Sequence, residues 1–215
     1  MKSREELLNV YDPAGAVLDA WPRSEAKASG RAVGAVNLLL VTGRGQVLLQ
    51  RRPVDKENGG LWDKSVGGHV SAGEDFDTAV VREAGEELFD DPVSPRVRLL
   101  ASEAAFTVAL GDADLSQQVV LRRVAWAANL RDVRLAPGGG SLNVLYHVAI
   151  YAGRTEVSLG DFRPQASEIA ELRYVDASQV DRWLLEGRLA PNMAYLWLTQ
   201  AHALLAVASG NHGHA

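Results

Sequence analysis

The pattern of apolar and polar positions predicts strands through most of the chain and helices toward its end. Short apolar runs bounded by glycine, proline and polar turn residues are typical of strands. Two such runs lie within 7–21 around a turn at 12–15, and others lie at 32–41, 46–52, 97–110, 143–152 and 168–175. The stretches 23–30 and 53–65 are expected to form a polar link and a glycine-containing loop.

Helical periodicity is clearest in the segment that starts at Phe76. Apolar residues recur there at helical spacing as far as Leu88, and Asp75 is placed to cap the first turn. Two closing helices are predicted at 177–187 and 190–208. The period over 112–135 is ambiguous, and we read it as a helix followed by a loop at 137–140.

No internal repeat or linker divides this order of elements. It predicts a single α+β domain over residues 1–208, with an N-terminal strand pair within 1–30 and a flexible tail at 209–215. The chain has 215 residues, of which 47% are hydrophobic and 23% charged. This is an ordinary globular composition with room for one sizeable core.

Charge and cysteine content exclude several classes of function. The net charge of −5 gives no general basic surface for nucleic acid. The chain has no cysteine, which excludes disulfides, thiolate metal sites and cysteine nucleophiles. Its first residues lack the apolar core of a signal peptide, and no apolar run approaches membrane-spanning length. We therefore expect a cytoplasmic protein with no nucleic-acid partner and no membrane partner.

The segment 67–88 concentrates negative charge in an unfavourable place. It carries one arginine, Arg82, against six carboxylates: Glu74, Asp75, Asp77, Glu83, Glu86 and Glu87. The three last glutamates adjoin the apolar stripe of the predicted helix and lie near its C-terminus, where the helix dipole favours cations. Like charges three or four residues apart each cost roughly 0.2–0.5 kcal/mol.

Two explanations of this acidic helix are open. A run of charge is usually a solvated helix face. A carboxylate cluster beside an apolar stripe is better explained by a hard divalent cation, because Mg²⁺ takes oxygen ligands from carboxylates, water and substrate phosphates. Metal binding would offset the repulsion that the bare helix suffers.

The same residues resemble the Nudix box, which is a glycine, five residues, a glutamate, seven residues, Arg-Glu, an apolar residue, any residue and Glu-Glu. The matching positions are Gly68, Glu74, Arg82, Glu83, Glu86 and Glu87. Phe89 and Asp90 depart from the glycine and apolar residue that the pattern expects next. The longer stretch 38–74 is similar to the Nudix subgroup that includes isopentenyl-diphosphate isomerase and its hydrolase-like relatives. Residues 111–140 lie outside that pattern and read as an insertion.

The resemblance implies an α/β/α sandwich with a mixed sheet and a Mg²⁺-dependent cleavage of a diphosphate, with Mn²⁺ as a substitute. It implies that Glu86 and Glu87 ligate the metal, assisted by the Gly68 carbonyl. Glu83 would be a further ligand or the base that activates water. Arg82 belongs to the catalytic set through a chiefly structural role, in which it and Glu74 hold the loop and helix in register.

Further candidates lie outside the box. Arg51, Arg52 and Lys56 precede it and are positioned to meet phosphate, although a solvated strand end is the alternative. Glu168 matches the place where relatives often carry an extra acidic ligand or base, and its alternative is a surface glutamate.

Three functions remain on this sequence. The leading one is hydrolysis of a nucleoside diphosphate or its derivative, a small-molecule partner, by a monomer or a homodimer. The second is isopentenyl-diphosphate isomerisation, but the resemblance puts a cysteine of those enzymes at Gly67, and no histidine lies in 23–33. The third is a non-catalytic nucleotide-binding module, which has no reason to keep three clustered glutamates.

Overall fold

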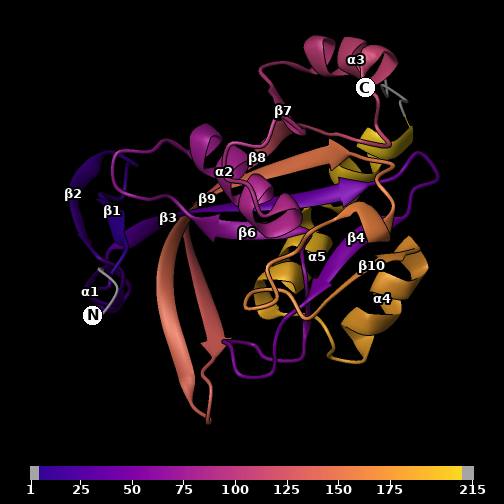
Figure 1. Ribbon diagram of the computed structural model, residues 1–215. Helices are drawn as coiled ribbons and strands as arrows, with labels where there is room; N and C mark the ends of the chain where they lie inside the picture. Colours follow the sequence, from indigo (N-terminus) through magenta and orange to yellow (C-terminus); the bar gives the residue numbers. More distant parts are fainter. Residues whose placement is uncertain (1–4, 210–215) are drawn as a thin grey trace.

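A mixed β-sheet runs through the molecule, with helices on both of its faces (Figure 1). The computed structural model describes residues 5–209. The sheet contains β1 (Leu7–Tyr11), β2 (Val17–Pro22), β3 (Ala32–Val41), β4 (Val47–Arg51), β5 (Trp62–Asp63), β6 (Val66–His69), β7 (Val97–Leu100), β8 (Val119–Leu135), β9 (Ser141–Arg154) and β10 (Glu171–Val175). Its main path runs β10-β4-β3-β9-β8-β7. β3 pairs with β9 in parallel, and so does β7 with β8, whereas the other pairs are antiparallel.

The helices are α1 (Arg23–Ala28), α2 (Phe76–Phe89), α3 (Glu103–Asp112), α4 (Ala177–Leu185) and α5 (Pro191–Ser209), with a short 3₁₀ turn at Leu159–Asp161. Within residues 5–209, none of them is both long enough and apolar enough to cross a membrane. α2 covers one face of the sheet and α5 the other (Figure 1). This arrangement confirms the predicted α+β fold with a mixed sheet.

β3 is the centre of the core because it is covered on both faces. All ten of its residues are buried, as its nearly continuous apolar sequence predicts. Leu38 and Leu40 join the apolar cluster under α2, together with Val80. Leu39 joins the cluster on the opposite face, which includes Leu196 of α5. The alternation along one strand therefore fixes both helices on the sheet.

α2 has the start that the sequence predicts and a different end. The Asp75 side chain accepts a hydrogen bond from the Thr78 backbone N–H, which caps the helix. The helix ends at Phe89, and its C-cap Asp90 has a φ of 54°, in the left-handed region. Aspartate tolerates this conformation better than most residues. Phe89 is buried against Phe162. The departure from the box pattern thus changes the helix exit and leaves the helix intact.

Three predicted elements are wrong. Residues 112–135 form mostly the strand β8, because hydrogen bonding to β9 on one side and β7 on the other overrides their helix propensity. Residues 97–110 split into β7 and α3, since the Ser102 side chain caps a helix by accepting from the Ala105 N–H. Residues 23–30 contain the short helix α1 rather than a polar link alone.

The predicted insertion 111–140 lies partly in the main sheet, and most of the predicted tail lies outside the described residues. The first part of β8 lies in the main sheet between β7 and β9. Only the far end of the β8–β9 hairpin, in which residues 132–135 pair with 141–144 alone, projects from the body (Figure 1). The loop predicted at 137–140 is the tip of this hairpin. Of the tail at 209–215, residues 210–215 lie outside the described part of the chain.

Candidate functional site

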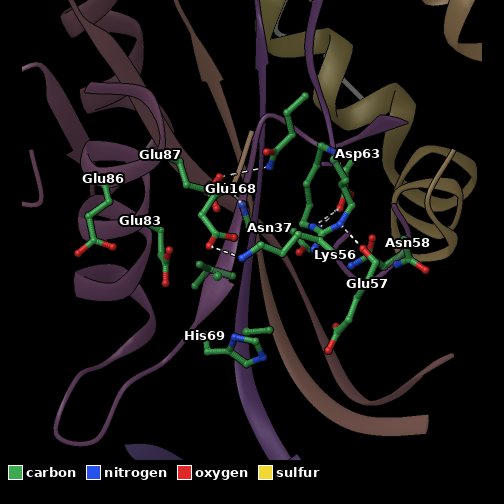
Figure 2. A pocket seen from close by; sticks show the side chains of 18 of the residues that line it. Asn37, Lys56, Glu57, Asn58, Asp63, His69, Glu83, Glu86, Glu87 and Glu168 are labelled. Atoms are coloured by element: carbon green, nitrogen blue, oxygen red, sulfur yellow. Dashed lines mark hydrogen bonds and ion pairs between the residues drawn. The ribbon is translucent and has the colours of Figure 1, made fainter. Parts of the chain in front are cut away.

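A polar cleft of about 580 Å³ opens beside α2 and holds most of the predicted site residues. Figure 2 shows Glu83, Glu86 and Glu87 on one side of it, projecting from α2, and Lys56, Asn58 and Asp63 on the other. Asn37 of β3 lies between the two walls. Of the predicted residues, the lining includes Arg52, Lys56, Gly68, Arg82, Glu83, Glu86, Glu87 and Glu168.

Arg82 forms hydrogen bonds with the acidic wall of the cleft, by which we mean the side that carries Glu83, Glu86 and Glu87. Its Nε and Nη2 donate to the two carboxylate oxygens of Glu74 at 2.8 and 3.0 Å. Its Nη1 donates to Glu83 and to Glu86, each at 3.0 Å, and its Nη2 also donates to the His69 carbonyl at 3.1 Å. These contacts join the loop before α2 to the helix, which is the structural role that the sequence predicts for Arg82 and Glu74.

Glu83 lies directly over Gly68. A Cβ at position 68 would stand 1.9 Å from Glu83 Cδ, so only glycine leaves room for this carboxylate. Burial raises the pKa of Glu83 to about 7, and Glu86 adds to the rise, although the charge of Arg82 opposes it. Glu83 is therefore a carboxyl group that titrates near neutral pH within the cleft.

Glu87 is the most deeply placed carboxylate of the cluster. It accepts hydrogen bonds from Gln50 Nε2 at 3.2 Å and from the Gly67 N–H at 3.4 Å. Burial raises the pKa of Glu87 well above its ordinary value; the charge of Glu83 adds to this rise and that of Lys64 opposes it. Two half-buried carboxylates with raised pKa values thus share one end of the cleft.

This donor set fits a divalent cation by its chemistry. In the arrangement described for residues 5–209, no three His, Asp or Glu side chains converge on one point as metal ligands do. Glu83 and Glu86 point to Arg82, whereas Glu87 accepts from Gln50 and Gly67. Oxygen ligands of this kind suit Mg²⁺ or Mn²⁺, and a cation would compensate the buried charge that raises both pKa values.

Ion pairs line the wall opposite the glutamates. Lys56 Nζ lies 2.8 Å from Glu168 Oε1, and this pair joins two loops at the mouth of the cleft (Figure 2). Arg52 donates to Asp63 Oδ2 at 3.2 Å. Both side chains line the cleft, as the sequence analysis expects of phosphate-binding residues. Arg51 does not, because alternation along β4 turns it away, and it donates to the Gly60 carbonyl and faces Glu171 instead.

Comparison with known proteins decides the family. The family model described as the NUDIX domain matches residues 30–197. The chain belongs to the Nudix family. An uncharacterized Nudix hydrolase of Pseudomonas aeruginosa is 34% identical over 87 residues, which are 40% of this chain and 52% of the relative. One from Streptomyces coelicolor is 36% identical over 89 residues, or 41% and 49%. These matches span about half the length of each relative.

A solved structure supports the fold. The crystal structure of DR0079 from Deinococcus radiodurans aligns with a TM-score of 0.61 over 89% of this chain and 96% of that one. The identity between the two is 19%, so the likeness concerns the fold. The segment that resembles the Nudix box, residues 68–87, runs from β6 into α2 and lies within the matched range.

Several lining residues of this Nudix cleft are not apparent from the sequence. Lys64 and Asp63 form a buried ion pair at 3.1 Å. Arg134, from the projecting hairpin, reaches Glu57 at 3.0 Å and carries one residue of the predicted insertion into the cleft. The only sequence features near these residues are the tryptophan before Asp63 and the charged residues around Glu57, and neither indicates a cleft. His69 is buried and its pKa is lowered, mainly by burial, so its ring is neutral.

Proposed function

We propose that this Nudix protein hydrolyses the diphosphate linkage of a nucleoside diphosphate or one of its derivatives with the help of Mg²⁺ or Mn²⁺. The observation that carries the proposal is the pair of half-buried carboxylates, Glu83 and Glu87, on one wall of a cleft that also holds the ion-paired cations Arg52 and Lys56. The names of the matched relatives, which are Nudix hydrolases, also support it.

In this proposal the acidic wall binds the metal, and Arg52 and Lys56 on the opposite wall bind the phosphates. Glu86 and Glu87 would hold the cation, with the Gly68 carbonyl as a further oxygen donor. When bound, such a cation neutralises charge on the diphosphate oxygens and lowers the pKa of a bound water. Arg52 and Lys56 contact the phosphates from the opposite side, where guanidinium and ammonium groups suit anionic oxygens.

Glu83 is placed to act as the general base. Its pKa of about 7 matches the requirement that a base accept a proton near neutral pH. Arg82 holds its carboxylate at 3.0 Å and keeps it over Gly68, so the base is oriented before substrate arrives. Glu168 lines the same cleft, where it pairs with Lys56 at 2.8 Å, and it is the candidate for an additional acidic ligand or base.

The isomerase alternative requires a proton donor at position 67, and this cleft has none there. Proton transfer to a double bond needs a positioned acid. Gly67 has no side chain, and the Lys64 side chain lies across the space where one would stand. A hydrolase therefore accounts better for the residues that line the cleft.

The test is a substrate screen with the full chain. Nucleoside diphosphates, sugar nucleotides, dinucleotides and coenzymes are incubated with Mg²⁺, and ³¹P NMR follows the products. We expect cleavage of at least one diphosphate, loss of activity in chelator, and a fall in kcat of at least ~100-fold in Glu87→Gln. The matched control is Glu171→Gln on β10, outside the cleft lining. Activity that persists in chelator, or no cleavage of any member, would overturn the proposal.

A further inference from the structure

Lys64 is a buried lysine whose side chain borders the catalytic end of the cleft. The residue is 4% exposed and lies between β5 and β6, yet it belongs to the lining. Its ammonium donates to Asp63 Oδ1 at 3.1 Å.

The backbone leaves a space for this side chain. A Cβ at position 67 would stand 2.1 Å from Lys64 Cε and 2.8 Å from Nζ. The Gly67 N–H itself lies 3.4 Å from Glu87 Oε2. Lys64 therefore crosses the backbone directly beside the glutamate, and it does so because residue 67 is glycine.

Asp63 has other hydrogen-bond donors besides the ammonium. Its Oδ1 already accepts the Lys64 backbone N–H at 2.9 Å, and its Oδ2 accepts from Arg52 at 3.2 Å. Burial opposes the charged form of Asp63, but the charges of Lys64 and Arg52 outweigh it and lower its pKa. A lysine ammonium has three donors, and Asp63 takes one of them.

Burying a lysine is costly unless its charge is paired and hydrogen-bonded, and the Asp63 pair uses one of the three donors of Lys64. Here the charge stands in a cleft, next to an acidic wall where a diphosphate is expected to bring further negative charge. We propose that Lys64 is a substrate-binding residue, whose ammonium contacts a phosphate oxygen beside Glu87 in a position that Gly67 keeps open. This inference rests on the proposed function and adds to it a residue between the two walls.

The test is binding of methylenediphosphonate, a diphosphate that cannot be hydrolysed at its bridge, to the full chain in Mg²⁺ by calorimetry. A charge-assisted hydrogen bond to phosphate predicts that Lys64→Ala weakens binding roughly tenfold to a hundredfold. Arg44→Ala, in the exposed β3–β4 turn outside the lining, is the matched control and should bind like wild type.

Gly67→Ala gives a second variant that keeps the lysine. The new Cβ displaces the flexible end of Lys64 and not the backbone, so the variant should fold and bind more weakly. In a Lys64→Ala background the same change meets no ammonium and should add little. Thermal melts establish folding for each variant.

Each result has a distinct meaning. Equal affinity in wild type, Lys64→Ala and Gly67→Ala would overturn the inference, and so would the absence of binding by wild type. A purely structural ion pair would lower the melting temperature and leave the affinity of the folded protein unchanged. Because the readout is binding, it can fail while the substrate screen succeeds, and the two proposals are judged separately.

Discussion

Replacing Arg82 by methionine tests whether one guanidinium holds the acidic wall together. The side chain is 21% exposed, and it donates to Glu74 through two hydrogen bonds and to Glu83 and Glu86 through one each. The charges of these glutamates raise its pKa, although burial acts against the rise. The methionine variant keeps most of the apolar stem and removes every one of these bonds.

The expected loss in the free energy of unfolding follows from the glutamates that remain without their cation. Removing one partner of a buried ion pair costs about 3–5 kcal/mol. Glu83, with a pKa already near 7, can take up a proton, and Glu86 is about a third exposed, so both limit the loss. We therefore expect about 3 kcal/mol, which corresponds to a fall in melting temperature of roughly 6–12 °C for a chain of this size.

The assay is urea unfolding of the full chain in chelator, because urea leaves ion pairs unscreened, with two comparison variants. Arg82→Lys keeps the charge and loses the fork, so its stability should lie between wild type and Arg82→Met. Arg123→Met removes an exposed pair with Asp77, and we expect a loss of about 0–1 kcal/mol. A loss below about 1 kcal/mol in Arg82→Met, or one equal to that of Arg123→Met, would refute the reasoning.

Three further predictions follow from other parts of the structure. Lys27 and Arg134 outweigh burial and lower the pKa of Glu57 from 4.5 to about 2, a stabilisation of about 3 kcal/mol that is present above pH 4.5 and lost as pH falls toward 2. The stability gap between wild type and Glu57→Gln should shrink over that window, and a constant gap would contradict it. Isopentenyl diphosphate with Mg²⁺ should yield no isomer by NMR, and enzymatic turnover would overturn this. Replacing hairpin residues 133–142 by a glycine-serine turn should change substrate preference or sedimentation, and unaltered behaviour in both would count against a role of the hairpin.

Local signals were enough to predict the element that carries the chemistry. Asp75 caps α2, and the apolar stripe with Val80 and Leu88 buries that helix on β3, so its bounds differ from the prediction by one residue. The strongly apolar β3 could be assigned for the same reason. The placement of Glu83 and Glu87 in one cleft follows from their spacing on that helix.

β8 was mispredicted because tertiary pairing decides its conformation. Its register shifts between Arg123 and Ala125 and again between Ala127 and Leu130, which breaks the alternation that marks a strand. Alanine, leucine and arginine also favour helices. The hydrogen bonds to β9, the next strand, and to β7 on the other side override both signals.

Lys64 and Arg134 could not be predicted as cleft residues for a related reason. A single lysine in a loop has no periodicity, and the packing of its side chain over Gly67 depends on the turn between β5 and β6. Arg134 reaches the cleft only because its strand lies beside the loop at Asn58. The Asn58 side chain accepts a hydrogen bond from the Leu135 N–H. Arg51 is the opposite case: its sequence position predicts a cleft residue, but its side chain donates to the Gly60 carbonyl outside the cleft lining.

Binding of Mn²⁺ to the full chain, followed by electron paramagnetic resonance, tests the central claim most directly. The account predicts that wild type binds Mn²⁺ and that Mg²⁺ competes for the same site. It also predicts that Glu87→Gln weakens binding at least about tenfold, whereas Glu171→Gln binds as wild type does. Equal binding by wild type and Glu87→Gln, or no binding by wild type, would contradict the assignment of the acidic helix to a divalent cation.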